Sequence, residues 1–111
     1  GSHARVLGVY VREKKVLPLM EAIRKMTLMP AQRMETAVES MRNKGRIKVG
    51  ADADLTVFDP ETVTDNATFD DPALPSGGIP YVLVNGVLVV EDSDLVDEAV
   101  PGQPVRRPVR Q

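Results

Sequence analysis

The chain has 111 residues, of which 42% are hydrophobic, and its formal net charge is −2 at neutral pH. This length fits one domain or a part of one, and this charge gives no electrostatic reason to expect nucleic acid or an anionic membrane as a partner. The sequence has no cysteine, which excludes disulfides and thiolate metal sites. No apolar run approaches the length of a membrane span and no signal peptide is visible, which favours a cytoplasmic location.

The first part of the chain has the pattern of a helical segment. Residues 1–3, Gly-Ser-His, resemble the remnant of a cleaved tag, so the helical segment is taken as residues 4–44. Residues 5–14 predict a helix whose apolar stripe consists of Val6, Leu7, Tyr10 and Val11. Gly8 lies inside this helix at a cost of about 1 kcal/mol relative to alanine, and we expect it to mark a close packing contact.

Two further helices are expected before residue 45. Pro18 suits the first position of the second helix, whose stripe consists of Leu19, Ala22, Ile23 and Met26. Pro30 ends that helix or begins the next. Residues 30–44 predict a third helix. Its apolar face consists of Met34, Ala37, Val38 and Met41. Its candidate C-terminal caps are Asn43 and Gly45. The five methionines could form a soft partner-binding surface, but core packing is favoured.

Residues 45–59 join the helical segment to a predicted sheet. Gly50 can supply the positive φ of a tight turn. Asp52 and Asp54 can accept hydrogen bonds from backbone N–H groups of that turn. Residues 55–58 are β-branched and apolar, which predicts a short strand.

A long proline- and glycine-rich stretch, residues 60–80, predicts an irregular loop with one turn of helix at most. Loops of this length in compact domains are usually functional or covered by a partner. Residues 81–84 and 87–90 flank Asn85-Gly86, which predicts a hairpin with a type I′ turn. Both strands are nearly continuous in apolar residues, so both faces are expected to be buried.

The rest of the chain completes an α+β arrangement. A polar turn at residues 91–94 leads to a short strand at Leu95-Val96, and residues 101–111 form an extended tail. The expected order is therefore a helical segment, a sheet segment over residues 45–100 that contains the loop 60–80, and the tail.

Four motifs in order resemble the amidohydrolase superfamily. Residues 45–47, Gly-Arg-Ile, with residues 50–55, Gly-Ala-Asp-Ala-Asp-Leu, and residues 57–59, Val-Phe-Asp, resemble a stretch that follows the (β/α)₈ barrel of that superfamily and returns the chain to a small β-sandwich. Three further segments are similar to parts of this superfamily. Residues 21–31 resemble its helix pair, the hairpin resembles its late hairpin, and residues 101–106 resemble its C-terminal ending. Residues 4–13 most resemble N-acyl-D-amino-acid deacylases. The resemblance implies that the helices are the last ones of the barrel and that the sheet is half of a composite sandwich.

The resemblance also implies the chemistry of a parent enzyme, which is zinc-dependent hydrolysis of N-acyl-D-amino acids. Its metal ligands lie upstream of the segment that begins here at Ala4, and the one histidine of this chain is His3, inside the presumed tag remnant. No catalytic, cofactor-binding or metal-binding residue can be carried over to any position here. The segment is therefore expected to be non-catalytic. The alternative is a free-standing interaction module derived from an amidohydrolase tail.

Other candidate site residues have simpler interpretations. Asp52 and Asp54 could be half of a calcium or magnesium site, but such a site needs several more oxygen ligands, so turn capping is favoured. Solvated turns are expected for the same reason at Asp70, Asp71, Asp92, Ser93 and Asp94. A solvated basic tail is favoured over an anion site for Arg106, Arg107 and Arg110. Thr27 and Ser40 have no histidine partner, which excludes a serine-type triad.

The resemblance implies a barrel against the apolar stripes and a second half-sandwich against the strands. Neither is part of this chain. Exposed apolar surface and free strand edges recruit other chains. The expected partner is therefore the missing N-terminal part of the enzyme or a second copy of the chain, and the contact of a homo-oligomer is expected to include residues 5–26 or the hairpin 81–90.

Overall fold

The computed structural model describes residues 1–109 and confirms the α+β class. The helical part consists of α1 (Ser2–Arg5), the π-helix η1 (Val6–Glu13), α2 (Leu19–Met26), α3 (Leu28–Met34) and the 3₁₀ helix η2 (Glu39–Asn43). One antiparallel sheet follows, in the order β1 (Leu55–Val57), β2 (Tyr81–Val84), β3 (Val87–Glu91) and β4 (Asp94–Leu95). Residues 2 and 3 are expected to belong to a tag remnant outside the helical segment, but α1 begins at Ser2, so both are helical.

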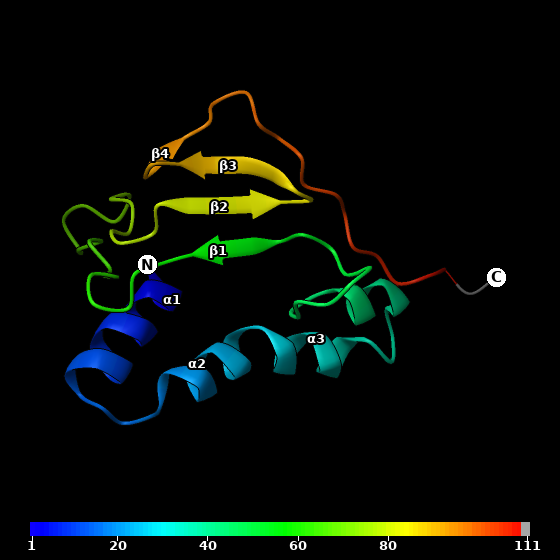
Figure 1. The fold of residues 1–111 in the computed structure, drawn as a ribbon, viewed down its shortest axis with the longest axis horizontal. Coiled ribbons are helices and arrows are strands. Elements are labelled where there is room, and N and C mark those ends of the chain that lie inside the picture. Colours follow the sequence, from blue (N-terminus) through cyan, green and yellow to red (C-terminus); the bar gives the residue numbers. More distant parts are fainter. Residues whose placement is uncertain (110–111) are drawn as a thin grey trace.

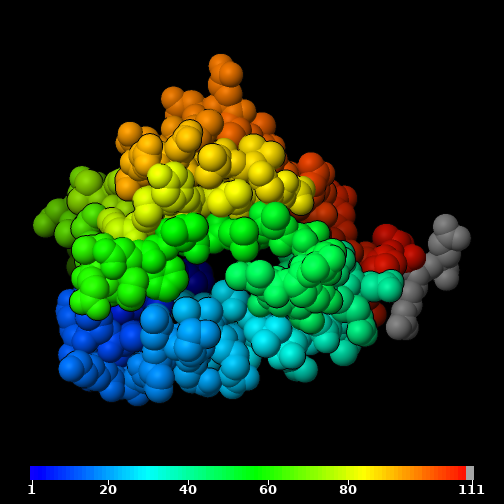
Figure 2. Space-filling model, viewed as in Figure 1, coloured from blue at the N-terminus to red at the C-terminus, as the bar shows by residue number. Residues whose placement is uncertain are grey.

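The helices and the sheet lie side by side (Figure 1). The helices run along one side of the molecule, and β1 is the strand nearest to them. The space-filling view is hollowed between β1 and the helical layer (Figure 2). The main cluster of buried residues is small, and it consists of Ala4, Leu7, Ala22 and Val63 with half-buried apolar side chains around it, while Ala31 and Val38 are buried outside this cluster.

The first predicted helix exists, but its hydrogen-bond pattern is not that of an α-helix. Residues 6–13 are wound as a π-helix, and the N–H of Lys14 donates to the carbonyl of Val9 at 2.8 Å. Leu7 is buried as the predicted stripe requires, whereas Tyr10 is 42% exposed and leaves the stripe. The Tyr10 ring instead contacts the ammonium group of Lys14, which lies 5.3 Å from the ring centroid.

Val63, in the predicted irregular loop, is the most deeply buried large side chain. It is 0% exposed, although the residues around it are loop residues. The backbone of Val63 lies so close to Gly8 and Gly78 that a Cβ at either position would approach it to less than 3.0 Å. The expected close contact of Gly8 is therefore confirmed, and the loop contributes to the core instead of only covering it.

The predicted third helix is shorter than the sequence indicates. Pro18 directly precedes α2, one position earlier than predicted, and Pro30 lies in the first turn of α3. Continuous helix over residues 30–44 is wrong, because α3 ends at Met34 and η2 begins at Glu39. Val38 between them is extended and buries its side chain, so core packing wins over helix continuation. Gly45 has φ +67°, which fits its predicted capping position after η2.

The expectation that the methionines pack in the core is wrong for three of them in this structure. Met20 and Met34 are largely exposed, and so is Met29. Met26 and Met41 are half-buried. The described residues therefore leave a soft apolar surface on α2 and α3 that their own fold does not cover.

The hairpin has the predicted turn. Asn85 and Gly86 both have positive φ, at 52° and 76°, which is the type I′ geometry. The expectation that both faces of the hairpin strands are buried is wrong, because every residue of β2 is only half-buried. Asp92 and Ser93 form a second turn with positive φ, and β4 lies one residue earlier than the predicted strand. The tail has no regular structure as far as residue 109.

Candidate functional site

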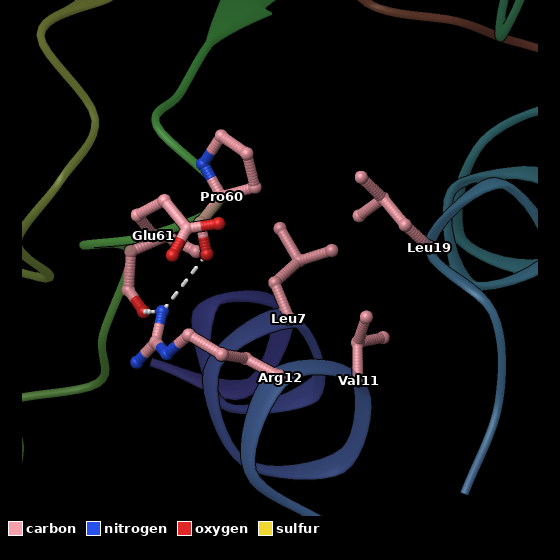
Figure 3. A pocket seen from close by; sticks show the side chains of 7 residues that line it. Leu7, Val11, Arg12, Leu19, Pro60 and Glu61 are labelled. Carbon is pink, nitrogen blue, oxygen red and sulfur yellow. Dashed lines mark hydrogen bonds between the residues drawn. The ribbon is translucent and has the colours of Figure 1, made fainter. Parts of the chain in front are cut away.

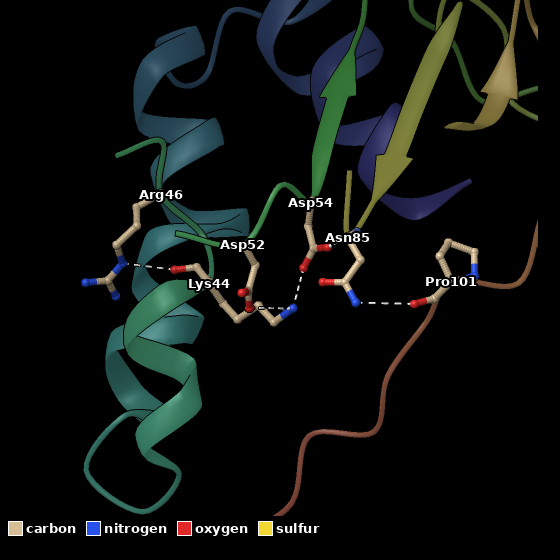
Figure 4. A network of polar contacts seen from close by, with 6 residues as sticks. All are labelled: Lys44, Arg46, Asp52, Asp54, Asn85 and Pro101. Carbon is tan, nitrogen blue, oxygen red and sulfur yellow. Dashed lines mark hydrogen bonds and ion pairs between the residues drawn. The ribbon is translucent and has the colours of Figure 1, made fainter. Parts of the chain in front are cut away.

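The joint between helices and sheet is held by a network of ion pairs centred on Lys44 (Figure 4). The ammonium nitrogen of Lys44 lies 2.9 Å from Asp52 Oδ2 and 2.5 Å from Asp54 Oδ2. The N–H of Asp52 donates to the carbonyl of Asn43 at 3.0 Å, which brings residue 44 beside both carboxylates. A lysine at the end of η2 is thus bound to the residues that precede β1.

The same network reaches the hairpin turn and the tail. Asp54 Oδ1 accepts the backbone N–H of Asn85 at 2.9 Å, and the N–H of Gly86 donates to the carbonyl of Ala53 at 3.0 Å. The side-chain amide of Asn85 donates to the carbonyl of Pro101 at 3.4 Å (Figure 4). The Asp54 carboxylate therefore joins the end of η2 to the hairpin turn, and the Asn85 side chain extends the network to the tail.

The network changes the titration of its charged groups. The hydrogen bond from Lys44, and then that from the Asn85 N–H, lowers the pKa of Asp54. The hydrogen bonds to Asp54 and then to Asp52 raise the pKa of Lys44. Both groups are therefore held in their charged forms over the neutral range.

This geometry decides between the interpretations of Asp52 and Asp54. The ammonium group of Lys44 lies where a cation shared by the two carboxylates would lie, so the pair fits a structural ion-pair cluster better than a calcium or magnesium site. Turn capping is only partly right, because the N–H that Asp54 accepts belongs to Asn85 in the hairpin and not to the joint's own turn.

A second arrangement joins η1 to the loop around an apolar hollow of about 200 Å³ (Figure 3). Leu7, Val11 and Leu19 line the hollow. Arg12 Nη1 donates to the carbonyl oxygens of Val63 at 2.7 Å and Pro60 at 3.1 Å. Because Nη1 binds backbone acceptors of the loop, Arg12 attaches the loop to the helix.

A third contact ties the same loop to α1. Arg5 Nε lies 2.9 Å from Asp65 Oδ2, and Asp65 Oδ1 accepts the N–H of Ala67 at 3.0 Å. The hydrogen bond from Arg5, and then that from Ala67, lowers the pKa of Asp65. This ion pair and the Arg12 contact fix the loop to the N-terminal helical segment at two residues that are seven positions apart.

The remaining candidates lie apart from one another. Asp71 and Thr68 close an exposed turn with mutual hydrogen bonds, and Asp70 is exposed beside it. Asp92 accepts the hydroxyl of Tyr81 at 2.6 Å. The hydroxyl of Thr27 donates to the carbonyl of Ile23 at 2.8 Å. Five others are exposed, namely Ser40, Ser93, Asp94, Arg106 and Arg107, and Arg110 lies outside the described range.

Sequence reasoning missed the residues that organise these contacts. The sequence pattern places Lys44 only at the end of a predicted helix and indicates no contact for Arg12 or Asp65. A basic residue eight positions before an Asp-x-Asp pair is a weak signal, since it becomes a partner only when the intervening loop closes. Nothing in the local pattern of residues 60–64 indicates that Val63 is buried.

Two properties of residues 1–109 bear on function. Within this range, no group of three or more histidine, aspartate or glutamate side chains could hold a metal ion. The residues present thus do not fit the zinc that the resemblance implies for a parent enzyme. None of the helices described for this range has the length and apolar character needed to cross a membrane.

Comparison with known proteins gives the family. A sequence profile described as "Amidohydrolase family" matches residues 2–90. N-acyl-D-glutamate deacylase of Alcaligenes xylosoxydans xylosoxydans is 52% identical over 89 residues, which are 80% of this chain and 17% of that protein. D-aminoacylase of the same organism is 42% identical over 92 residues, covering 83% of this chain and 18% of the relative. The chain belongs to the amidohydrolase family.

Solved structures agree with this assignment. A crystal structure of D-aminoacylase has a TM-score of 0.76 and 41% identity over 86% of this chain and 19% of that chain. N-acyl-D-glutamate deacylase from Bordetella bronchiseptica, complexed with zinc and a phosphonate inhibitor, has a TM-score of 0.72 and 48% identity over 80% of this chain and 18% of that chain. This chain therefore spans only about a fifth of the length of the relatives it matches.

Proposed function

We propose that this chain is a non-catalytic structural segment of a metal-dependent deacylase that hydrolyses N-acyl-D-amino acids. The observation that carries the proposal is the match over residues 2–90 to deacylases of which this chain covers only a fifth. The parent reaction adds water across the amide bond, releasing a carboxylate and a free D-amino acid. In the parent, zinc would act as the Lewis acid that activates this water.

The metal ligands of the parent would lie outside these 111 residues. Asp52 and Asp54 are both paired with Lys44, and Asp65 is paired with Arg5. The side chains of this segment would instead hold its helices, loop and sheet in one arrangement against the enzyme body. The sheet would supply half of a composite sandwich, consistent with its half-buried faces.

A chimeric enzyme tests the proposal directly. Residues 2–90 would replace the matched stretch of the Alcaligenes N-acyl-D-glutamate deacylase. The chimera is expected to fold, to bind zinc and to hydrolyse N-acyl-D-glutamate. An unfolded or inactive chimera, beside an active unaltered deacylase prepared in parallel, would contradict the proposed role.

The isolated chain provides the complementary test. Freed of any tag, it is expected neither to hold stoichiometric zinc nor to turn over an N-acyl-D-amino acid above a buffer blank, because zinc sites need three or four protein ligands. A metal analysis that finds one zinc per chain would reveal a zinc site in this segment and would contradict the proposal.

A further inference from the structure

The loop formed by residues 45–51 is closed at its base. The N–H of Asp52 donates to the carbonyl of Asn43 at 3.0 Å, and the N–H of Ala51 donates to the carbonyl of Lys48 at 3.1 Å. On one side of the base, Lys44 binds two carboxylates, and on the other, Arg46 Nη2 lies 2.9 Å from Glu35 Oε2. The backbone of this short loop is thus held before anything contacts its tip.

Two apolar side chains and one charged side chain of the loop are arranged opposite to the usual order. The charged side chain of Arg46 folds back against the protein and is only 22% exposed. Ile47 and Val49 are 90% and 103% exposed, so they lie almost wholly in water. Charged residues are ordinarily the exposed ones and isoleucine and valine the buried ones. Here the ion pairs fix a geometry that directs two apolar side chains outward.

We propose that Ile47 and Val49, the apolar tip of this loop, insert into an apolar site on the part of the deacylase chain that lies outside these 111 residues. This inference rests on the proposed function and names a place where the segment docks. The family match includes the loop, while about four-fifths of a relative's length is absent from this chain. The ion pairs at the base lower the ordering cost of docking, since the loop is already held in its bound shape.

The test compares one pair of substitutions in two settings. Ile47→Ser with Val49→Ser would be made in the isolated chain and in the chimeric deacylase that carries residues 2–90. Lys48→Ser, an exposed residue between them on the same loop, is the matched control. Thermal unfolding midpoints and sedimentation would be measured for each, and deacylase activity for the chimeras.

The expected result is a difference between the two settings. The double substitution should leave the midpoint of the isolated chain unchanged, because both side chains are already in water. It should lower the midpoint of the chimera by about 5 °C, because there the two side chains are buried. Lys48→Ser should change neither.

Each other outcome overturns the proposal in a distinguishable way. If the double substitution changes the midpoint of an active chimera no more than Lys48→Ser does, the docking contact is contradicted and the proposed function is still supported. An isolated chain that is oligomeric and dissociates on the double substitution would make a second copy the occupant. An unsubstituted chimera that does not fold would overturn the proposed function, and the docking contact with it.

Discussion

The carbonyl oxygen of Val63 lies 2.8 Å from the position that a Cβ on residue 8 would occupy, so the π-helix and the loop are in backbone contact through Gly8. Gly8→Ala should therefore lower the free energy of unfolding by about 1 kcal/mol. Overpacking costs about 1–3 kcal/mol, which exceeds the gain of up to about 1 kcal/mol in helix propensity. Urea denaturation of the variant measures the change.

Gly102→Ala is the control for that substitution, because a Cβ there meets no atom within 4 Å. Its midpoint should equal that of the parent chain. If Gly8→Ala also left the midpoint unchanged, the contact between η1 and the loop would be looser than the structure has it.

The hairpin turn gives a second prediction. Gly86 has φ +76°, which valine adopts only with strain, while its Cβ would meet Ala53 at an ordinary 3.8 Å. Gly86→Val should thus cost about 1–3 kcal/mol through the backbone alone. Denaturant midpoints of Gly86→Val and Gly102→Val decide the matter, and equal midpoints would show that the type I′ turn is wrong.

The Lys44 network predicts a pH dependence of stability. The lowered pKa of Asp54 means that its contribution is present above its ordinary value of 3.8 and is lost as the pH falls through the lower folded value. The raised pKa of Lys44 means that its contribution is present below 10.5 and is lost as the pH rises through the higher folded value. The network should therefore stabilise the fold between these limits.

Lys44→Met should lower the free energy of unfolding by about 1 kcal/mol at pH 7, the upper range for partly exposed ion pairs. This deficit should shrink below pH 3.8 and above pH 10.5, where the parent chain loses the same contribution. Lys48→Met, on the same loop, is the control and should follow the parent curve. A deficit that is constant from acid to alkaline pH would assign the loss to packing of the lysine stem instead of charge.

Association of the isolated chain is the fourth prediction. The pairing register places Val82, Val84, Val87, Val90 and Leu95 on one face of the sheet, and none of them is buried. We predict a homo-oligomer whose contact includes the hairpin 81–90 or residues 5–26, measured by sedimentation equilibrium at micromolar concentration. A compact monomer of 12.1 kDa that unfolds cooperatively would instead favour a free-standing module.

Local features of the fold could be predicted from sequence because they depend on neighbours in the chain. Asn85-Gly86 specifies its turn, since both positions must adopt positive φ. The stripe of α2 follows from helical periodicity, and Ala22 is fully buried as that stripe requires. The ordered motifs likewise indicate the amidohydrolase family, which the match over residues 2–90 confirms.

Only the tertiary structure decided which residues connect these elements. Val63 is buried because Gly8 and Gly78 leave space for its backbone, and these residues are far apart in the chain. Lys44 meets Asp52 and Asp54 because a loop closes between them, which periodicity does not encode. Val38 leaves the predicted third helix because burying its side chain outweighs one more turn of local hydrogen bonds. Local pattern thus determined the elements, while long-range packing and charge pairing determined where they meet.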